Sequence, residues 1–287
     1  MSDSVRGYPL RAFVICLIAY TTAQMDLALF GYAVPAIRAE FGLTLSEVMA
    51  IVSSAFLLGG ALLVVLGWLA DRMGRLPLFQ FSLLGSSVLV ALISIAPGVA
   101  TLTALRGASI AVGGLSYPIT GAIITEEMPA RLRGLFMGLL QIGYPLGWAL
   151  ASLWSMWLLT EYGWRQLFWV GLVSLPMVWV VRCYLREPPR SVAARSTESP
   201  PRFSDLFATG IRERAITLFI AQFLFVWAYA ASIFLFPSFL REVRALDAFN
   251  FSLLIGAGNA IGVLGYMLAA WTGERVWTRR NTVVLWT

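Results

Sequence analysis

Histidine and lysine are both absent from this 287-residue sequence, so all 21 of its basic residues are arginine. Without histidine, the chain lacks the commonest metal ligand and the commonest general base. Its two cysteines, Cys16 and Cys183, are too few for a disulfide framework or a metal cluster. The hydrolase motifs H-E-x-x-H and G-x-S-x-G do not occur either. We therefore expect no metal site, no cofactor and no enzymatic activity.

Charged residues are scarce as well. They make up 13% of the sequence, against about 25% in soluble domains, whereas hydrophobic residues make up 59%. The hydrophobic residues gather in runs of roughly 20 residues, the length that a helix needs to cross a bilayer. These runs cover residues 12–36, 48–70, 77–96, 100–123, 135–159, 164–183, 215–240 and 248–272. The sequence therefore predicts an all-α, polytopic membrane protein.

The arginines are distributed unevenly about these spans. Arg106 lies inside a span, and all but four of the others fall on the side of the N-terminus; the exceptions are Arg38, Arg165, Arg241 and Arg244. Because loops rich in arginine stay in the cytoplasm, we expect a multi-pass protein of the plasma (inner) membrane with a cytoplasmic N-terminus. The formal charge of +6 then reflects topology and contact with membrane lipids, not nucleic-acid binding.

Asp26 and Arg106 are the ionisable residues that lie deep within the predicted spans. A charge at the middle of a bilayer costs a few kcal/mol unless it is paired or hydrated. Counted from the outer ends of their spans, the two residues differ in height by about 5 Å. We therefore expect them to face a shared aqueous cavity and to pair across it. A structural pair that fixes helix register is the alternative.

Residues 67–75, between the second and third runs, carry glycines and charges in a regular pattern. They predict a tight turn in which Gly67 and Gly74 let the chain reverse and the backbones come close. The spacing G-x-x-x-D-R-x-G-R resembles the signature loop of the major facilitator superfamily, although Leu76-Pro77 departs from that family's usual basic residue. The resemblance implies a cytoplasmic gate made by Gly67, Asp71, Arg72, Gly74 and Arg75. The alternative is a charged turn that only fixes orientation.

Two further segments resemble the organic-acid proton symporters of that superfamily. In residues 106–114 an arginine is followed by small residues, and residues 141–147 resemble span five of that group, whose members also carry an aspartate in span one. With the support of this resemblance, we expect Asp26 to bind the coupled proton and Arg106 to bind a substrate carboxylate or to tune Asp26. Other candidate substrate-binding residues are Tyr117, Gln141, Tyr144, Gln222, Tyr229 and Asn259. Tyr117 follows Arg106 by about three helical turns and so shares its face, but for each of these six residues helix packing is the alternative role.

The order of the runs divides the chain into three parts. Residues 1–185 form a six-span bundle, residues 186–214 form a cytoplasmic linker rich in Arg, Ser and Pro, and residues 215–287 form part of a second bundle. Residues 273–280 look like a decayed copy of residues 67–75, as two six-span halves would require. We therefore expect a major-facilitator-type helical bundle with a complete first half plus two helices of the second, from a truncated twelve-span protein. An eight-span protein is the alternative.

The resemblance implies secondary active transport. We expect a monomer that carries a small organic anion together with a proton by alternating access. A sugar or other metabolite porter of the same superfamily is one alternative, because Gln141, Gln222 and Asn259 could bind hydroxyl groups. An inactive fragment or a sensor is another, because alternating access requires two halves that move about a central site.

Overall fold

The described chain is almost entirely helical, as a bilayer requires of a spanning segment whose backbone must satisfy its own hydrogen bonds. The structure, a computed structural model, describes residues 7–187, 210, 212–276 and 281, apart from some side chains of α2 and α11. These residues include no β-strand. The elements are α1 (Tyr8–Phe41), α2 (Leu45–Met73), α3 (Arg75–Ile93), α4 (Val99–Gly114), α5 (Ser116–Glu127), α6 (Arg133–Leu140), α7 (Gly143–Glu161), α8 (Trp164–Leu167), the 3₁₀ helix η1 (Phe168–Ser174), α9 (Leu175–Tyr184), α11 (Arg212–Glu242) and α12 (Ala248–Arg275).

Seven segments of the described chain are long and apolar enough to cross a membrane. They are α1, the first part of α2, α3, α12, and three composite spans in which helices are joined end to end: α4 with α5, α6 with α7, and α8 with η1 and α9. These segments coincide with the predicted spans one to six and eight, and the all-α membrane class is confirmed. The predicted span seven coincides with α11, which is 31 residues long. Most of the predicted linker, residues 277–280 and the start of a ninth span lie outside the described residues.

Prolines explain why three spans consist of more than one helix. Pro118, Pro145 and Pro176 each lie in the first turn of the helix that follows a break. Proline has no N–H, so the carbonyl four residues earlier loses its helical partner. Before Pro145, for example, the Gln141 carbonyl accepts a hydrogen bond from the Tyr144 N–H at 3.0 Å instead.

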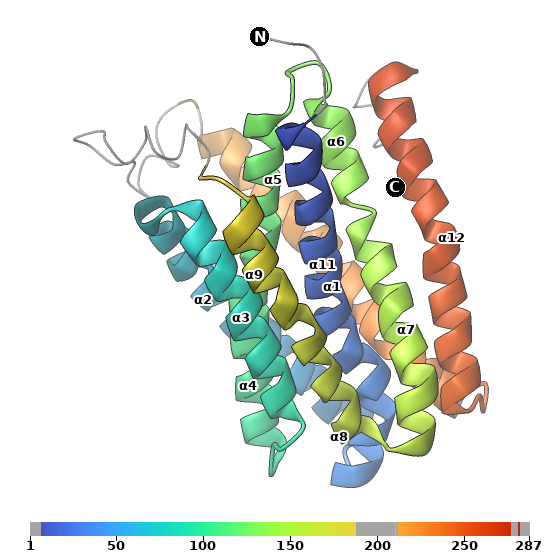
Figure 1. The fold of residues 1–287 in the computed structure, drawn as a ribbon. Helices are drawn as coiled ribbons and strands as arrows, with labels where there is room; N and C mark the ends of the chain where they lie inside the picture. Colours follow the sequence, from blue (N-terminus) through green and yellow to red (C-terminus); the bar gives the residue numbers. More distant parts are fainter. Residues whose placement is uncertain (1–6, 188–209, 211, 277–280, 282–287) are drawn as a thin grey trace.

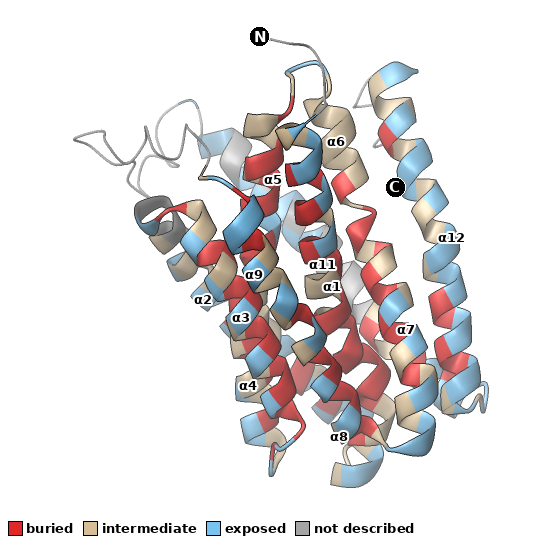
Figure 2. Ribbon diagram, viewed as in Figure 1, coloured by how far each residue is buried: buried red, intermediate tan, exposed pale blue. Residues whose placement is uncertain are grey.

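Helix α1 runs through the middle of the bundle and is buried along most of its length (Figures 1 and 2). It packs against α5, α7, α11 and η1. The approach of α7 is very close at Gly147, where a Cβ would lie 2.7 Å from both the Thr21 carbonyl oxygen and the Met25 nitrogen. Only glycine permits the two backbones to come so near.

Helix α12 has a different environment. It packs against α6 and α7 on one side, whereas much of its surface is exposed (Figure 2). The exposed side chains include Leu264, Leu268 and Trp271, all more than half exposed. Large apolar side chains at the surface are typical of a face that contacts lipid.

The turn between α2 and α3 is shorter than the sequence predicts. Helix α2 continues through the motif to Met73, and the chain reverses at Gly74, whose φ of 100° favours glycine. Gly67 lies inside α2, and a Cβ there would meet no atom within 4 Å. Its predicted role in close backbone packing is therefore wrong, because the apolar run carries the helix past it. The side chains of Asp71 and Arg72 lie outside the described part of the structure.

Candidate functional site

Asp26 lies near the middle of α1 and is 2% exposed. The Ser174 hydroxyl of η1 lies 3.3 and 3.4 Å from its two carboxylate oxygens and can donate its single proton to either. Ser174 is itself buried at the end of η1, directly before the break that precedes Pro176. In the described chain this hydroxyl is the hydrogen-bond donor to Asp26. A carboxylate can accept about four hydrogen bonds, so the oxygens of Asp26 keep lone pairs that are free to accept a further hydrogen bond or a proton.

Arg106 lies in α4, and it too is 2% exposed. Its Nη2 donates a hydrogen bond of 2.8 Å to the Leu27 carbonyl oxygen of α1. Its Cζ lies 4.6 Å from the centroid of the Phe30 ring, also in α1, which gives a cation–π contact. A guanidinium has five N–H donors, and the described contacts use one of them. The side chain is thus fixed in direction while most of its donors stay available.

Both residues line one cavity of about 110 Å³. Its wall comes from α1, α2, α3 and α4, that is, from the first four spans: Ala23, Gln24, Asp26, Leu27, Phe56, Ser86, Val90, Arg106, Ser109, Ile110, Gly113 and Gly114. A water molecule occupies about 30 Å³ of liquid. The cavity therefore has room for a few waters or one small ligand.

The two charged groups share this cavity, but they do not form the direct ion pair that the sequence predicts. Within the described residues, Arg106 is directed to the Leu27 carbonyl and the Phe30 ring, whereas Asp26 is directed to Ser174. The charges are still near enough to attract each other. The space beside them is open to a third group.

Sequence reasoning missed four polar residues of this region: Gln24, Ser86, Ser109 and Ser174. Gln24 carried a signal, because it is a polar residue in a predicted span two positions before Asp26. The three serines carried none, because serine is common in membrane helices and the sequence does not show which way it faces. Ser86 and Ser109 donate to carbonyls of their own helices, to Leu83 at 3.3 Å and to Arg106 at 2.8 Å.

The remaining candidate side chains do not line this cavity within the described structure. Tyr117 is 47% exposed, and its hydroxyl accepts a hydrogen bond of 3.0 Å from Gln141 Nε2. Tyr20 donates to Oε1 of the same Gln141 at 3.5 Å. Tyr117 lies in α5, beyond the break that ends α4, and eleven residues correspond to about 16 Å along a helix axis. These three polar side chains therefore form a separate cluster.

Tyr144 and Asn259 are also separate from the cavity. The Tyr144 ring lies 6.1 Å from that of Trp148. Asn259 donates from Nδ2 to the Ile255 carbonyl of its own helix at 2.9 Å, which is a local bond of α12. The side chains of Gln222 and Tyr229 in α11 lie outside the described residues.

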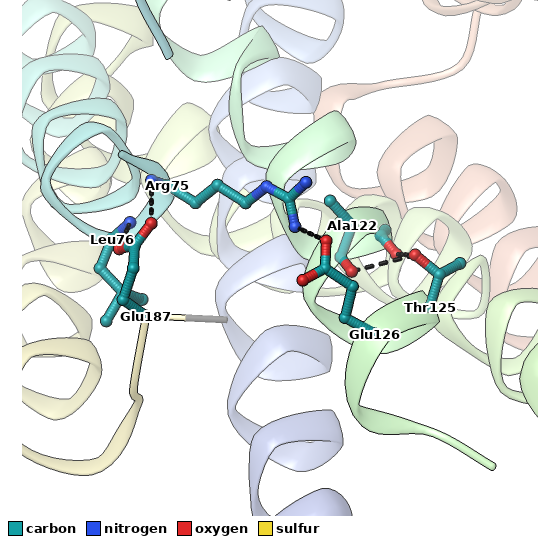
Figure 3. Close-up of polar contacts among 7 residues, drawn as sticks. Arg75, Leu76, Ala122, Thr125, Glu126 and Glu187 are labelled. Carbon is teal, nitrogen blue, oxygen red and sulfur yellow. Dashed lines mark hydrogen bonds and ion pairs between the residues drawn. The ribbon is translucent and has the colours of Figure 1, made fainter. Parts of the chain in front are cut away.

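At the end of the bundle that carries the N-terminus, charged residues of three segments meet (Figure 3). Arg75, the first residue of α3, forms an ion pair with Glu126 near the end of α5. Glu187, which follows α9, accepts hydrogen bonds from the backbone N–H groups of Arg75 at 2.7 Å and Leu76 at 3.0 Å. The first N–H groups of a helix have no partner inside it. Glu187 therefore caps α3 and fixes the turn at Gly74.

At the opposite end, an ion pair holds α11 against α1. Arg38 of α1 forms an ion pair with Glu242, the last residue of α11. Farther along α11, the buried Phe234 packs its ring 5.5 Å from that of Phe56 and 5.8 Å from that of Trp148. Phe234 and Arg106 also border the same narrow crevice. Helix α11 thus reaches the neighbourhood of the cavity.

Comparison with known proteins decides the family. The family model of the Major Facilitator Superfamily matches residues 16–286. The chain belongs to this superfamily. The resemblance seen in its motifs is confirmed, and with it the prediction that this multi-pass membrane protein is not an enzyme. In the described residues, no group of three or more Cys, Asp or Glu could hold a metal ion.

Relatives of the chain are named as transporters. The chain is 27% identical to the cis,cis-muconate transport protein of Acinetobacter baylyi, over 93% of this chain and 67% of that protein. It is 26% identical to the niacin transporter NiaP of the same species, over 88% of this chain and 64% of that protein. The chain thus spans about two thirds of the length of these relatives.

A solved structure shows the same fold. It is a bacterial homolog of the human lysosomal transporter Spinster in an inward-facing and occupied conformation. The TM-score is 0.69, over 97% of this chain and 63% of that one, at 17% sequence identity. At this level of identity the similarity concerns the fold alone.

Proposed function

We propose that this protein carries a small organic anion across the membrane together with a proton, with Arg106 as the anion site and Asp26 as the proton site. The relatives named above as transporters of cis,cis-muconate and niacin handle molecules that carry carboxyl groups. The observation that carries the proposal is the buried Arg106 beside a cavity, with one of its five N–H donors in use.

Arg106 suits a carboxylate for geometric reasons. A guanidinium binds a carboxylate through two parallel N–H···O bonds, which are stronger than bonds between neutral groups. The Leu27 carbonyl and the Phe30 ring hold the side chain in place from one direction. The donors that remain unused are then already oriented when an anion arrives, so little side-chain entropy is lost on binding.

Asp26 couples this binding to a proton through charge balance. When Asp26 is ionised, its charge and that of Arg106 cancel, and an added anion leaves the site with a net negative charge. One uncompensated charge at mid-membrane costs about 2.5–3.5 kcal/mol on insertion scales, which corresponds to roughly a 100-fold change in affinity. Protonation of Asp26 removes that cost. Anion and proton therefore favour each other's binding by the same factor.

The rest of the proposal concerns topology and the gate. The end of the bundle that carries the N-terminus faces the cytoplasm, in the plasma (inner) membrane of a monomeric carrier. Residues 1–185 act as one six-span half, and residues 215–287 belong to the other, joined by the segment 186–214. The motif of Gly67, Asp71, Arg72, Gly74 and Arg75 acts as the cytoplasmic gate. The capping of α3 by Glu187 and the ion pair of Arg75 with Glu126 support this role, because they hold the motif in one geometry.

The anion site is tested by calorimetric binding to the purified full chain in detergent. The probes are nicotinate and nicotinamide, which have similar shapes and differ in charge. We expect nicotinate to bind and nicotinamide to bind at least about tenfold more weakly, because a charge-assisted pair contributes 1.5–3 kcal/mol. Arg106→Gln should abolish this preference. Arg241→Gln is the matched control, because Arg241 also donates to a backbone carbonyl, that of Leu246, but at the surface. Equal binding of nicotinate by wild type and Arg106→Gln would refute the anion site.

A further inference from the structure

The amide group of Gln24 makes no hydrogen bond to the part of the chain that the structure describes. Its Oε1 is buried and has no partner, and the described hydrogen bonds of this region include none from its Nε2. A buried acceptor without a partner costs about 1–3 kcal/mol. Such a cost is removed when a ligand or water supplies the missing partner, so the position of this amide indicates what the cavity binds.

Gln24 lines the same cavity as Arg106. Arg106 donates to the carbonyl of Leu27, which lies three residues after Gln24 on α1. Three residues correspond to about 4.5 Å along a helix axis. The wall therefore offers a cation and an unused amide within about one helical turn of each other.

The other polar groups of the wall already have protein partners. Ser86 and Ser109 donate their hydroxyl protons to carbonyls of their own helices, and Asp26 accepts from Ser174. Among the described side chains of this wall, Gln24 and Arg106 thus have the largest unused hydrogen-bonding capacity. An amide can accept at its oxygen and donate from its nitrogen.

From this arrangement we infer that Gln24 determines specificity and that the anion carries a hydroxyl group near its carboxylate. A hydroxyl both donates to Oε1 and accepts from Nε2, so it satisfies both sides of the amide. The spacing along α1 places that hydroxyl a few bonds from the carboxylate held by Arg106. The cavity has a volume of about 110 Å³. Hydroxy acids of a few carbon atoms, such as glycolate, lactate and 3-hydroxybutyrate, are the simplest compounds that present both groups.

This inference rests on the proposed function, because it takes Arg106 as the carboxylate site. It is tested with matched acids that differ by one hydroxyl: glycolate against acetate, lactate against propionate, and 3-hydroxybutyrate against butyrate. Affinities are measured by calorimetry on the full chain in detergent. In at least one pair the wild type should bind the hydroxy acid about five- to tenfold more tightly, as one neutral hydrogen bond allows. Gln24→Leu should remove that preference.

The controls separate the possible failures. Thr22→Val, a change on α1 at a residue whose hydroxyl bonds to the Ala19 carbonyl, should keep the preference. If Gln24→Leu does not fold, Gln24→Met replaces it. If neither variant folds, the comparison of paired acids on the wild type decides. Equal binding within every pair, or a preference that survives in Gln24→Leu, overturns the role of Gln24 and leaves Arg106 as an anion site. Absence of binding by every acid, nicotinate included, overturns the proposed function itself.

Discussion

Replacing Gly147 by alanine tests how closely α1 must sit against α7. A Cβ at this position would lie 2.6 Å from Gln24 Cβ, 2.7 Å from the Met25 nitrogen and 2.7 Å from the Thr21 carbonyl oxygen. Ordinary contacts of a Cβ begin at 3.4 Å. Two of the three atoms belong to the backbone of α1, so they cannot turn aside as a flexible side chain would. The two helices must therefore separate locally by about 0.7 Å.

The size of the effect follows from that separation. Overpacking a close helix contact costs about 1–3 kcal/mol. The displaced part of α1 carries Gln24 and Asp26, which line the cavity. A binding site loses its geometry when its groups move by more than about 0.5 Å. We therefore expect Gly147→Ala to lower both the stability of the protein and its affinity for nicotinate, the latter by about tenfold.

Thermal unfolding in detergent and calorimetry with nicotinate measure these two quantities. Gly258→Ala is the matched control, because a Cβ at Gly258 in α12 would meet no atom within 4 Å. Alanine at such an open helical position favours the helix by up to about 1 kcal/mol, so this variant should be at least as stable as the wild type. If Gly147→Ala is as stable as Gly258→Ala and binds nicotinate equally well, the close α1–α7 contact is refuted.

Two further predictions concern the ends of the bundle. Glu187→Gln removes the charge that caps α3 and should lower the free energy of unfolding, measured in detergent, by about 0.5–2 kcal/mol. The control Glu161→Gln, at an exposed site, should not lower it. Equal losses in the two variants would contradict the cap. The ion pair of Arg38 with Glu242 should give a coupling free energy of about 0.2–1 kcal/mol in a double-mutant cycle of alanine variants, measured by unfolding. Purely additive effects of the two substitutions would show that the ion pair does not hold α11 against α1.

The fold could be predicted from the sequence because membrane insertion leaves a strong signal. A span must be apolar over about 20 residues, and the runs that meet this condition coincide with the observed helices. The residues at which the helices begin and end could be predicted less accurately. The first run covers 12–36, whereas α1 covers Tyr8–Phe41, because hydropathy marks the thickness of the bilayer and a helix continues into the polar layer beyond it. In the same way, α2 continues to Met73 until Gly74 ends it.

The candidate site could be predicted from the sequence only because it contains two charged residues. Asp26 and Arg106 stand out in apolar spans, and their heights led to one shared cavity. Their contacts carried no such signal, because Arg106 donates to the backbone of Leu27 and Asp26 contacts a serine on a 3₁₀ turn. The position of Tyr117 was misjudged because the sequence argument assumed one continuous helix, whereas the span breaks between α4 and α5, and because it left out the distance along the axis.

The coupling of anion and proton is the central claim, and the pH dependence of nicotinate affinity tests it most directly. If one proton is taken up with each anion, the affinity for the anion falls by up to tenfold for each unit that the pH rises above the titration range of Asp26. The wild type should therefore bind nicotinate more weakly as the pH rises through the titration of Asp26, to a total of roughly 100-fold. Asp26→Asn, which cannot ionise, should bind nicotinate with the same high affinity throughout. An Asp26→Asn variant that retains the pH dependence of the wild type would contradict the account.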